Sequence, residues 1–383
     1  CRISKQHSTF LQSRVQYPDG SQVDRGWATS VSYRTMWLSQ GQAGRGARVR
    51  IALDAMGGDR APGETIAGAV EAARQHQVEV ILVGQRPVVE EELARHQTAG
   101  LALSVVDAPE VVTMDESPTV SYRTKKRSSI AVGLGLVRDG EAGGFVSAGN
   151  SGAVMTSALF ILGRIKGIDR PALGLAYPTR LGRCLLIDVG ANVDCKPAYL
   201  AQFGVMGSVY AEKVLGCQNP KVALLSNGEE ESKGNQLVLE ARDLLRAAPI
   251  SFTGNIEGKD IPSGLADVVV CDGFVGNVVL KLSEGLGEFL FQLLREEIAK
   301  GLLSQVAAGA LLPAFRAVKR RVDYEEYGGV PLLGVNGVCS IAHGRSSAKA
   351  IRNAIRVALQ EAEEGVVAAI TQRVAQLEGT SEA

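Results

Sequence analysis

Short apolar runs alternate with segments of helical periodicity along the chain from Val49 onward. The apolar runs are VRIALDA, VEVILVG, LALSVVDA, GGFVSAG, PALGLAYP, RCLLIDVG, KVALLSNG, ISFTGN and ADVVVCDG. Between the first three lie GETIAGAVEAARQ and PVVEEELARHQ, in which apolar residues recur every three or four positions. Continuous apolar runs that end in Gly or Asp are typical of buried strands in a parallel sheet. The pattern therefore predicts an α/β fold with a mostly parallel sheet.

The pattern changes towards both ends of the chain. After Asn277 it becomes helical, which predicts a helical arm or hairpin at about residues 280–322 and one final helix over AKAIRNAIRVALQEAEEGVVAAITQRVAQL. Residues 1–48 show no sustained period and hold no apolar run long enough for a signal peptide. We expect residues 1–48 to be a disordered extension or upstream sequence that is not translated, with a genuine extra module as the alternative. Residues 49–383 then form a single α/β domain.

Polar residues gather where five of the predicted strands end. The candidate substrate-binding residues at these corners are Asp54, Gly57, Gly58, Gly149, Asn150, Ser151, Gly152, Asp188, Gly190, Asn192, Lys196, Asn227, Asp272, Gly273 and Gly276. Because ligands bind at the carboxyl ends of parallel strands, we expect the corners to share one cleft lined by backbone amides, which suits an anion such as phosphate. The corner at 149–152 has a simpler alternative, an Asn or Ser cap at the start of a helix.

Three further side chains are candidates for a site. Lys233 follows three glutamates and precedes Gly-Asn and a predicted helix, so it could bind phosphate or stabilise an oxyanion; the alternative is a surface lysine paired with those glutamates. Asn277 could donate a hydrogen bond to a carbonyl oxygen, or it could cap the following helix. His343 lies between a predicted strand and a helix, and it could belong to the site or be a loop histidine bonded to backbone.

Composition and motifs exclude several classes of protein. Lys plus Arg equal Asp plus Glu at 41 each, so no global charge attracts nucleic acid or a membrane. Six cysteines without a close pair indicate reduced thiols in a cytoplasmic protein, and neither a disulfide framework nor a metal site is expected. The corners do not match a dinucleotide fingerprint, a nucleotide phosphate loop or a Gly-x-Ser-x-Gly elbow, so we expect no cofactor and no covalent acyl-enzyme.

Two local runs depart from this neutrality. They are YRTKKRSS at 122–129 and VKRR at 318–321, the second of which follows an apolar stripe. A basic run is usually a solvated face. The functional alternative is a docking surface for an acidic protein or for an anionic membrane.

Eight long motifs, taken in their order along the chain, resemble the bacterial phosphate acyltransferase family of phospholipid synthesis. They are IALDAMGGD, FVSAGNSGA, LGRIKGIDRPAL, IDVGANVDCKP, GVMGSVYAEKVLG, CDGFVGNVVLK, YGGVPLLGVNGV and AHGRSSAKAIRNAI. The resemblance covers the chain from about Val49 to the final helix. It implies a three-layer α/β/α fold similar to phosphate acetyltransferases and isocitrate-type dehydrogenases. It also implies reversible transfer of a fatty acyl group from acyl carrier protein to inorganic phosphate.

The resemblance extends to partners and to single residues. It implies a homodimer, delivery of the acyl phosphate to a membrane glycerol-3-phosphate acyltransferase, and peripheral contact of the cytoplasmic protein with the membrane. By position, the family's catalytic Lys and Asn fall on Lys233 and Asn277, and its helical arm for pairing and membrane contact falls on about 300–322. Arg60 stands where the family usually has His, so the acid–base role of that His is not expected here, although an arginine at this position could bind an anion.

Two alternatives remain at this stage. The first is an enzyme of the same fold that uses an acyl-CoA donor. The second is a module without catalytic activity that binds lipid-synthesis proteins at the membrane through the arm. Five crowded polar corners argue against the second alternative, because a scaffold has no use for them.

Overall fold

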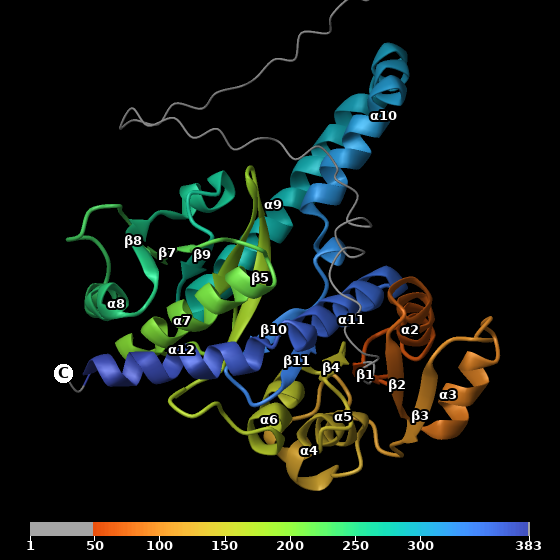
Figure 1. The fold of residues 1–383 in the computed structure, drawn as a ribbon. Helices are drawn as coiled ribbons and strands as arrows, with labels where there is room; N and C mark the ends of the chain where they lie inside the picture. The colour runs from red at the N-terminus through yellow and green to blue at the C-terminus, as the bar shows by residue number, and fades with distance from the viewer. Residues whose placement is uncertain (1–48, 382–383) are drawn as a thin grey trace, which may run out of the picture. The chain divides into compact units, whose positions relative to one another are not determined.

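The computed structural model describes residues 49–381 of the 383-residue chain. The segment 1–48, for which disorder or a separate module was predicted, lies outside the described residues. Eleven strands form one sheet in the order β3-β2-β1-β4-β11-β10-β5-β6-β9-β7-β8 (Figure 1).

The sheet has two parallel halves joined by antiparallel strands. The first half holds β1 (Arg50–Asp54), β2 (Glu79–Gly84), β3 (Leu103–Asp107), β4 (Gly144–Ser147) and β11 (Val338–Ile341). The joining strands are β10 (Val330–Leu333) and β5 (Ala172–Thr179). The second half holds β6 (Gly182–Ile187), β7 (Lys221–Leu225), β8 (Ser251–Ile256) and β9 (Val268–Val270). Each apolar run that predicted a strand contains one, which confirms the predicted α/β fold.

The direction of the strands reverses between the two halves. Strand β11 pairs antiparallel with β10, β10 with β5, and β5 with β6, so the second half runs opposite to the first. The carboxyl ends of β1, β4 and β11 therefore lie at one edge of the sheet, called the first edge below. Those of β6, β9 and β7 lie at the opposite, second edge. The polar corners therefore lie at two edges of the sheet, because three antiparallel pairings stand between the halves.

Helices cover both faces of the sheet. Alternation along the strands explains this: Ala52 packs into the same core as α5 and α6, whereas its neighbours Ile51 and Leu53 pack with α2 and α11. Below the second half, α7, α8 and α12 form a third core with β6, β7 and β9. The main helices are α2 (Gly63–His76), α3 (Arg86–Leu93), α4 (Pro118–Thr124), α5 (Ser129–Arg138), α6 (Ser151–Ile161), α7 (Pro197–Lys213), α8 (Gln236–Ala247), α9 (Gly273–Ala299), α10 (Leu302–Val322), α11 (Ala348–Glu363) and α12 (Val366–Ser381). Short 3-10 turns occur at η1 (Gly258–Ser263) and η2 (Tyr324–Glu326).

The predicted final helix is two helices. Helix α11 ends at Glu363 and α12 begins at Val366, with Gly365 between them at a φ of 63°. This left-handed conformation is readily adopted by glycine, and it stops a helix. The prediction of one continuous helix is therefore wrong at this residue.

Helices α9 and α10 lie side by side and extend away from the sheet (Figure 1). Large apolar side chains are exposed along α9 at intervals of three or four residues. They include Phe274, Val278, Leu282, Leu286, Phe289 and Leu293. Among the described residues, no helix combines the length and apolarity that crossing a lipid bilayer requires.

Candidate active site

Asp54 organises the first edge from the end of β1. Its carboxylate is buried and accepts hydrogen bonds from the hydroxyl of Ser147 at 2.7 Å and from the amide of Met56 at 3.1 Å. Burial raises the pKa of Asp54, and the hydrogen bonds from Ser129 and Ser147 oppose that rise. A Cβ at Gly57 would lie 2.8 Å from the amide nitrogen of Gly149, so the two glycine corners touch through their backbones. Asp54 thus holds two loops together, and any ligand would meet the backbone of those loops.

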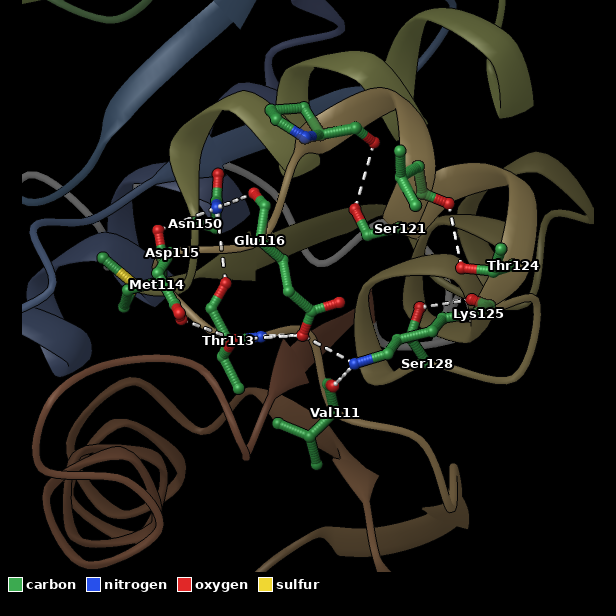
Figure 2. Close-up of polar contacts among 12 residues, drawn as sticks. Val111, Thr113, Met114, Asp115, Glu116, Ser121, Thr124, Lys125, Ser128 and Asn150 are labelled. Carbon is green, nitrogen blue, oxygen red and sulfur yellow. Dashed lines mark hydrogen bonds and ion pairs between the residues drawn. The ribbon is translucent and has the colours of Figure 1, made fainter.

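Asn150 begins the next helix and also binds a distant loop. Its Oδ1 accepts a hydrogen bond from the amide of Ala153 at 3.0 Å, which makes it the N-cap of α6. Its Nδ2 donates to the carbonyl oxygens of Thr113 at 3.3 Å, Met114 at 3.0 Å and Glu116 at 3.0 Å (Figure 2). The helix-cap alternative is therefore correct for Asn150. Ser151 remains exposed at the start of α6, and Pro118 packs against Gly152.

His343 lies at the same edge, after β11. Its Nδ1 accepts a hydrogen bond from the amide of Arg345 at 3.2 Å, which fits the alternative of a loop histidine bonded to backbone. Burial lowers the pKa of His343, and the positive charges of Lys281 and Arg345 lower it further, which favours the neutral imidazole. Next to it, the amide of Asp59 donates to the carbonyl of Gly344 at 2.8 Å. This contact joins the loop with Gly58 to the loop with His343.

Asp188 organises the second edge in the same way. Its Oδ1 accepts hydrogen bonds from the amides of Leu173, Gly190 and Ala191, and its Oδ2 accepts from the amide and the side chain of Asn192 at 2.7 and 2.9 Å. Burial raises the pKa of Asp188 against these bonds. Asn192 also donates to the carbonyl of Pro171 at 2.8 Å. Asp188 and Asn192, which were predicted to bind substrate, therefore use these hydrogen bonds to fix the loop after β6.

Helix α9 begins directly on this loop. Asp272 caps it by accepting from the amide of Val275 at 2.9 Å. A Cβ at Gly273 would lie 2.7 Å from the carbonyl oxygen of Asn192, and one at Gly276 would overlap the carbonyl oxygen of Asp188. Only glycine permits this approach. The capping alternative for Asn277 is wrong, because Asp272 is the cap.

Asn277 and Lys233 are exposed on adjacent strand ends. Asn277 follows β9 in the second turn of α9, and a Cβ at Gly190 would lie 3.8 Å from its Cβ. Lys233 follows β7, which pairs with β9, and its Cγ would lie 2.6 Å from a Cβ at Gly228. Lys196 and Asn227 are exposed on the neighbouring loops.

Two of the three glutamates before Lys233 have other partners. Glu231 pairs with Arg246 at 2.6 Å, and Glu229 lies 4.0 Å from Lys259. Lys233 itself forms no ion pair with any of the described residues. The alternative of a lysine paired with neighbouring glutamates is therefore wrong, and its ammonium group can meet an anion.

Helix α9 connects the two edges. It starts at the second edge with Gly273, and its third turn carries Lys281, whose charge acts on His343 at the first edge. The hydroxyl of Ser283 is 2.8 Å from that of Tyr177 on β5, which fixes the helix across the joining strands. The motif CDGFVGNVVLK contains Lys281. The contacts of α9 with β5 and with His343 were nevertheless not predicted, because they join residues that are distant in the sequence.

Lys125 and Cys195 refine two further predictions. In the basic run 122–129, Lys125 turns inward and binds Glu116 at 2.6 Å, whereas Arg123, Lys126 and Arg127 are exposed. Near the second edge, burial raises the pKa of Cys195 to about 12. The negative charge of Asp188 contributes to this rise to a smaller extent. A thiol that stays protonated is a poor nucleophile.

Comparison with known proteins places the chain in a family. A family model described as "Fatty acid synthesis protein" matches residues 49–369. The phosphate acyltransferase of Pelotomaculum thermopropionicum is 53% identical over 330 residues, which cover 86% of this chain and 96% of the relative. That of Geobacter sulfurreducens is 52% identical over 318 residues, which cover 83% of this chain and 92% of the relative.

Solved structures of lower identity share the fold. A phosphotransacetylase from Streptococcus pyogenes superposes with a TM-score of 0.58 at 20% identity, covering 83% of this chain and 95% of that one. A 4-hydroxythreonine-4-phosphate dehydrogenase from Klebsiella pneumoniae gives a TM-score of 0.51 at 14% identity, with 82% and 100% covered. These matches confirm the predicted fold. The family model and the curated relatives, which match most of the chain, show that it belongs to the fatty acid synthesis protein family of phosphate acyltransferases.

Proposed function

We propose that this protein transfers a fatty acyl group from acyl carrier protein to inorganic phosphate, which gives acyl phosphate for phospholipid synthesis. The observation that carries the proposal is the exposed ammonium group of Lys233, which has no ion pair within residues 49–381 and follows the strand beside the one that leads to Asn277. The names of the curated relatives support phosphate as the acyl acceptor.

The chemistry needs positioning more than activation. A phosphate oxygen attacks the thioester carbonyl carbon, the carbon–sulfur bond breaks, and the carrier thiolate leaves and takes up a proton. Phosphate is nucleophilic enough at neutral pH, so the protein contributes by fixing it and by stabilising the oxyanion. In this proposal the ammonium group of Lys233 stabilises the negative charge of the phosphate or the oxyanion. The carboxamide of Asn277 donates a hydrogen bond to the carbonyl oxygen of the thioester. Burial raises the pKa of Cys195 to about 12, which argues against its thiol as a nucleophile and agrees with direct attack by phosphate.

The donor and the recipient complete the proposal. We assign acyl carrier protein as donor and acyl-CoA as the alternative, and a membrane glycerol-3-phosphate acyltransferase as the enzyme that takes the acyl phosphate. Turnover on palmitoyl carrier protein compared with palmitoyl-CoA distinguishes the donors. A kcat/KM about 100-fold higher on the carrier supports the proposal, because carrier contacts outside the thioester add binding energy. Equal values would assign CoA.

A second copy of the chain is the proposed partner of α9 and α10. An exposed apolar stripe such as the one on α9 commonly marks an interaction surface. A lipid surface is the alternative to a second copy of the chain as its partner. Leu282→Glu places a charge in the middle of the stripe, so sedimentation should show monomers of this variant, whereas we expect a dimer of the wild type. Leu244→Glu, an exposed leucine on α8, is the matched control and should leave the dimer intact. A Leu282→Glu protein that stays dimeric but no longer floats with anionic vesicles would assign the stripe to the membrane.

The reaction itself is tested with the full chain. Palmitoyl carrier protein is incubated with and without inorganic phosphate, free thiol is measured, and hydroxylamine traps acyl phosphate as the hydroxamate. The proposal predicts thiol release only with phosphate, in equal amount to trapped hydroxamate. A folded protein that releases no thiol from either donor would leave the binding module as the correct reading.

A further inference from the structure

The segment 113–116 lies over the first edge and is held from two sides. From α6, the Nδ2 of Asn150 donates to three of its carbonyl oxygens (Figure 2). Asn150 is 8% exposed, so these bonds are largely shielded from water. Shielded hydrogen bonds of one amide to three carbonyls fix a loop more firmly than its own turns would.

The second hold comes from Lys125, just beyond α4. Its Nζ donates to the carbonyl of Val111 at 2.7 Å and to Oε1 of Glu116 at 2.6 Å. The same Oε1 accepts from the amide of Thr113 at 2.8 Å. The hydrogen bonds from Lys125 and Thr113 hold the pKa of Glu116 below its usual range, so the carboxylate stays charged at neutral pH.

The segment places one apolar side chain against the site. A Cβ at Gly344 would lie 3.0 Å from the methyl group of Met114 and 3.2 Å from a carboxylate oxygen of Asp59. Gly344 follows His343 directly, so the thioether lies beside the candidate site. Met114 is nevertheless 49% exposed. A half-exposed methionine on a rigid backbone is suited to contact an apolar substrate group, because its side chain adapts while its position is fixed.

We infer that Asn150 is a positioning residue that fixes the segment 113–116 as a wall of the first edge, and that Met114 on this wall contacts the acyl chain of the substrate. The inference rests on the proposed function, which supplies the acyl chain. It gives Asn150 a different part from the phosphate contact predicted for its corner, and it makes Met114 a determinant of chain-length preference.

Asn150→Asp separates the wall from the helix cap. Aspartate caps a helix as well as asparagine does, so α6 keeps its first turn. The carboxylate cannot donate, and it faces three carbonyl oxygens that repel it. Hydrogen exchange of the amides at 113–116 should become about tenfold faster. Asn235→Asp is the matched control, because Asn235 caps α8 by accepting from Val238, and exchange at 113–116 should stay as in the wild type.

The link to the substrate is tested by chain-length preference. The ratio of kcat/KM for palmitoyl to that for octanoyl carrier protein should fall about tenfold in Met114→Ala. It should fall similarly in Asn150→Asp, and no further in the double variant, because both changes remove the same contact. Val120→Ala removes an exposed apolar side chain of α4 and should leave the ratio unchanged.

Two results would overturn the inference. Unchanged exchange at 113–116 in a folded Asn150→Asp protein would show that Asn150 does not hold the wall. An unchanged ratio in Met114→Ala, or a double variant with the product of the two single losses, would show that the wall does not act through Met114. A wild type without phosphate-dependent release would refute the proposed function instead, and the exchange experiment would still decide the part played by Asn150.

Discussion

The polar residues at the strand ends fall into two groups that differ in burial. Asp54, Asp188 and Asn150 are buried, and their side chains form hydrogen bonds with neighbouring loops. Lys233 and Asn277 are exposed. A sequence predicts both groups equally well, because Gly, Asn and Asp serve turns and ligands alike. What separates them is burial, which depends on strands distant in the chain. Asp54, for example, meets Ser147 across 93 positions.

Lys233→Ala is the residue-level test of the proposed site. Loss of a cation that stabilises developing negative charge should lower kcat by about 100-fold to 1,000-fold, with the melting temperature unchanged because the side chain is exposed. Lys259→Ala removes a nearby exposed lysine that is paired with Glu257 at 2.5 Å, and it should keep wild-type turnover. Steady-state kinetics on palmitoyl carrier protein measures both. A Lys233→Ala protein with normal kcat would remove Lys233 from the site.

Glu361 predicts a dependence of stability on pH. It is fully buried on α11, its Oε1 has no hydrogen-bond partner among residues 49–381, and burial raises its pKa from 4.5 to about 8. The folded protein therefore holds a proton that the unfolded chain loses near pH 4.5, so this residue's favourable contribution is complete below that pH and is lost as pH rises towards about 8. Glu361→Gln should be more stable than the wild type at about pH 8. This advantage in stability should be much smaller at about pH 5.

Thermal unfolding at the two pH values measures this effect. Glu364→Gln changes an exposed glutamate at the end of the same helix and should show no such difference. A stability gap between Glu361→Gln and the wild type that is the same at both pH values would mean that Glu361 is already ionised in the folded protein.

At the scale of elements, the glycines of α9 differ in whether they can be replaced. The two at its start leave no room for a side chain, whereas one farther along the helix does. Gly276 faces the backbone of Asp188 without room for a Cβ, whereas an added Cβ at Gly285 would meet no atom of the described residues within 4 Å. Gly276→Ala should therefore lower the melting temperature by several degrees and disturb the Asn277 site. Gly285→Ala should raise stability by about 0.5–1 kcal/mol through helix propensity. Thermal unfolding of the pair checks both signs, and a neutral Gly276→Ala would contradict the close approach of α9 to the loop.

The predictability of elements followed the length of their patterns. Nine apolar runs were enough to predict strands β1 to β9, and helical periodicity predicted α9 and α10. Strand β11 was predicted as the strand before His343, whereas β10 was not predicted, because its run VPLL contains a proline, which is uncommon inside strands. The break between α11 and α12 depended on one glycine inside a strong helical pattern.

At the scale of the molecule, the reversal of strand direction decides where the site lies. Parallel pairing within each half follows from the buried apolar runs, but antiparallel pairing of β10 with β5 joins residues more than 150 positions apart. No local pattern contains that information. The two edges that result are connected by α9. Lys233 and Asn277 lie at the second edge, and His343 and the segment 113–116 lie at the first.

The most direct test of the account is rapid mixing of the wild-type protein with palmitoyl carrier protein, first without and then with inorganic phosphate, with thiol release followed from the first turnover. If phosphate is the attacking group, no thiol appears in its absence, and release begins without a lag when it is added. A burst of thiol equal in amount to the enzyme and independent of phosphate would show a covalent acyl-enzyme, and it would contradict direct transfer.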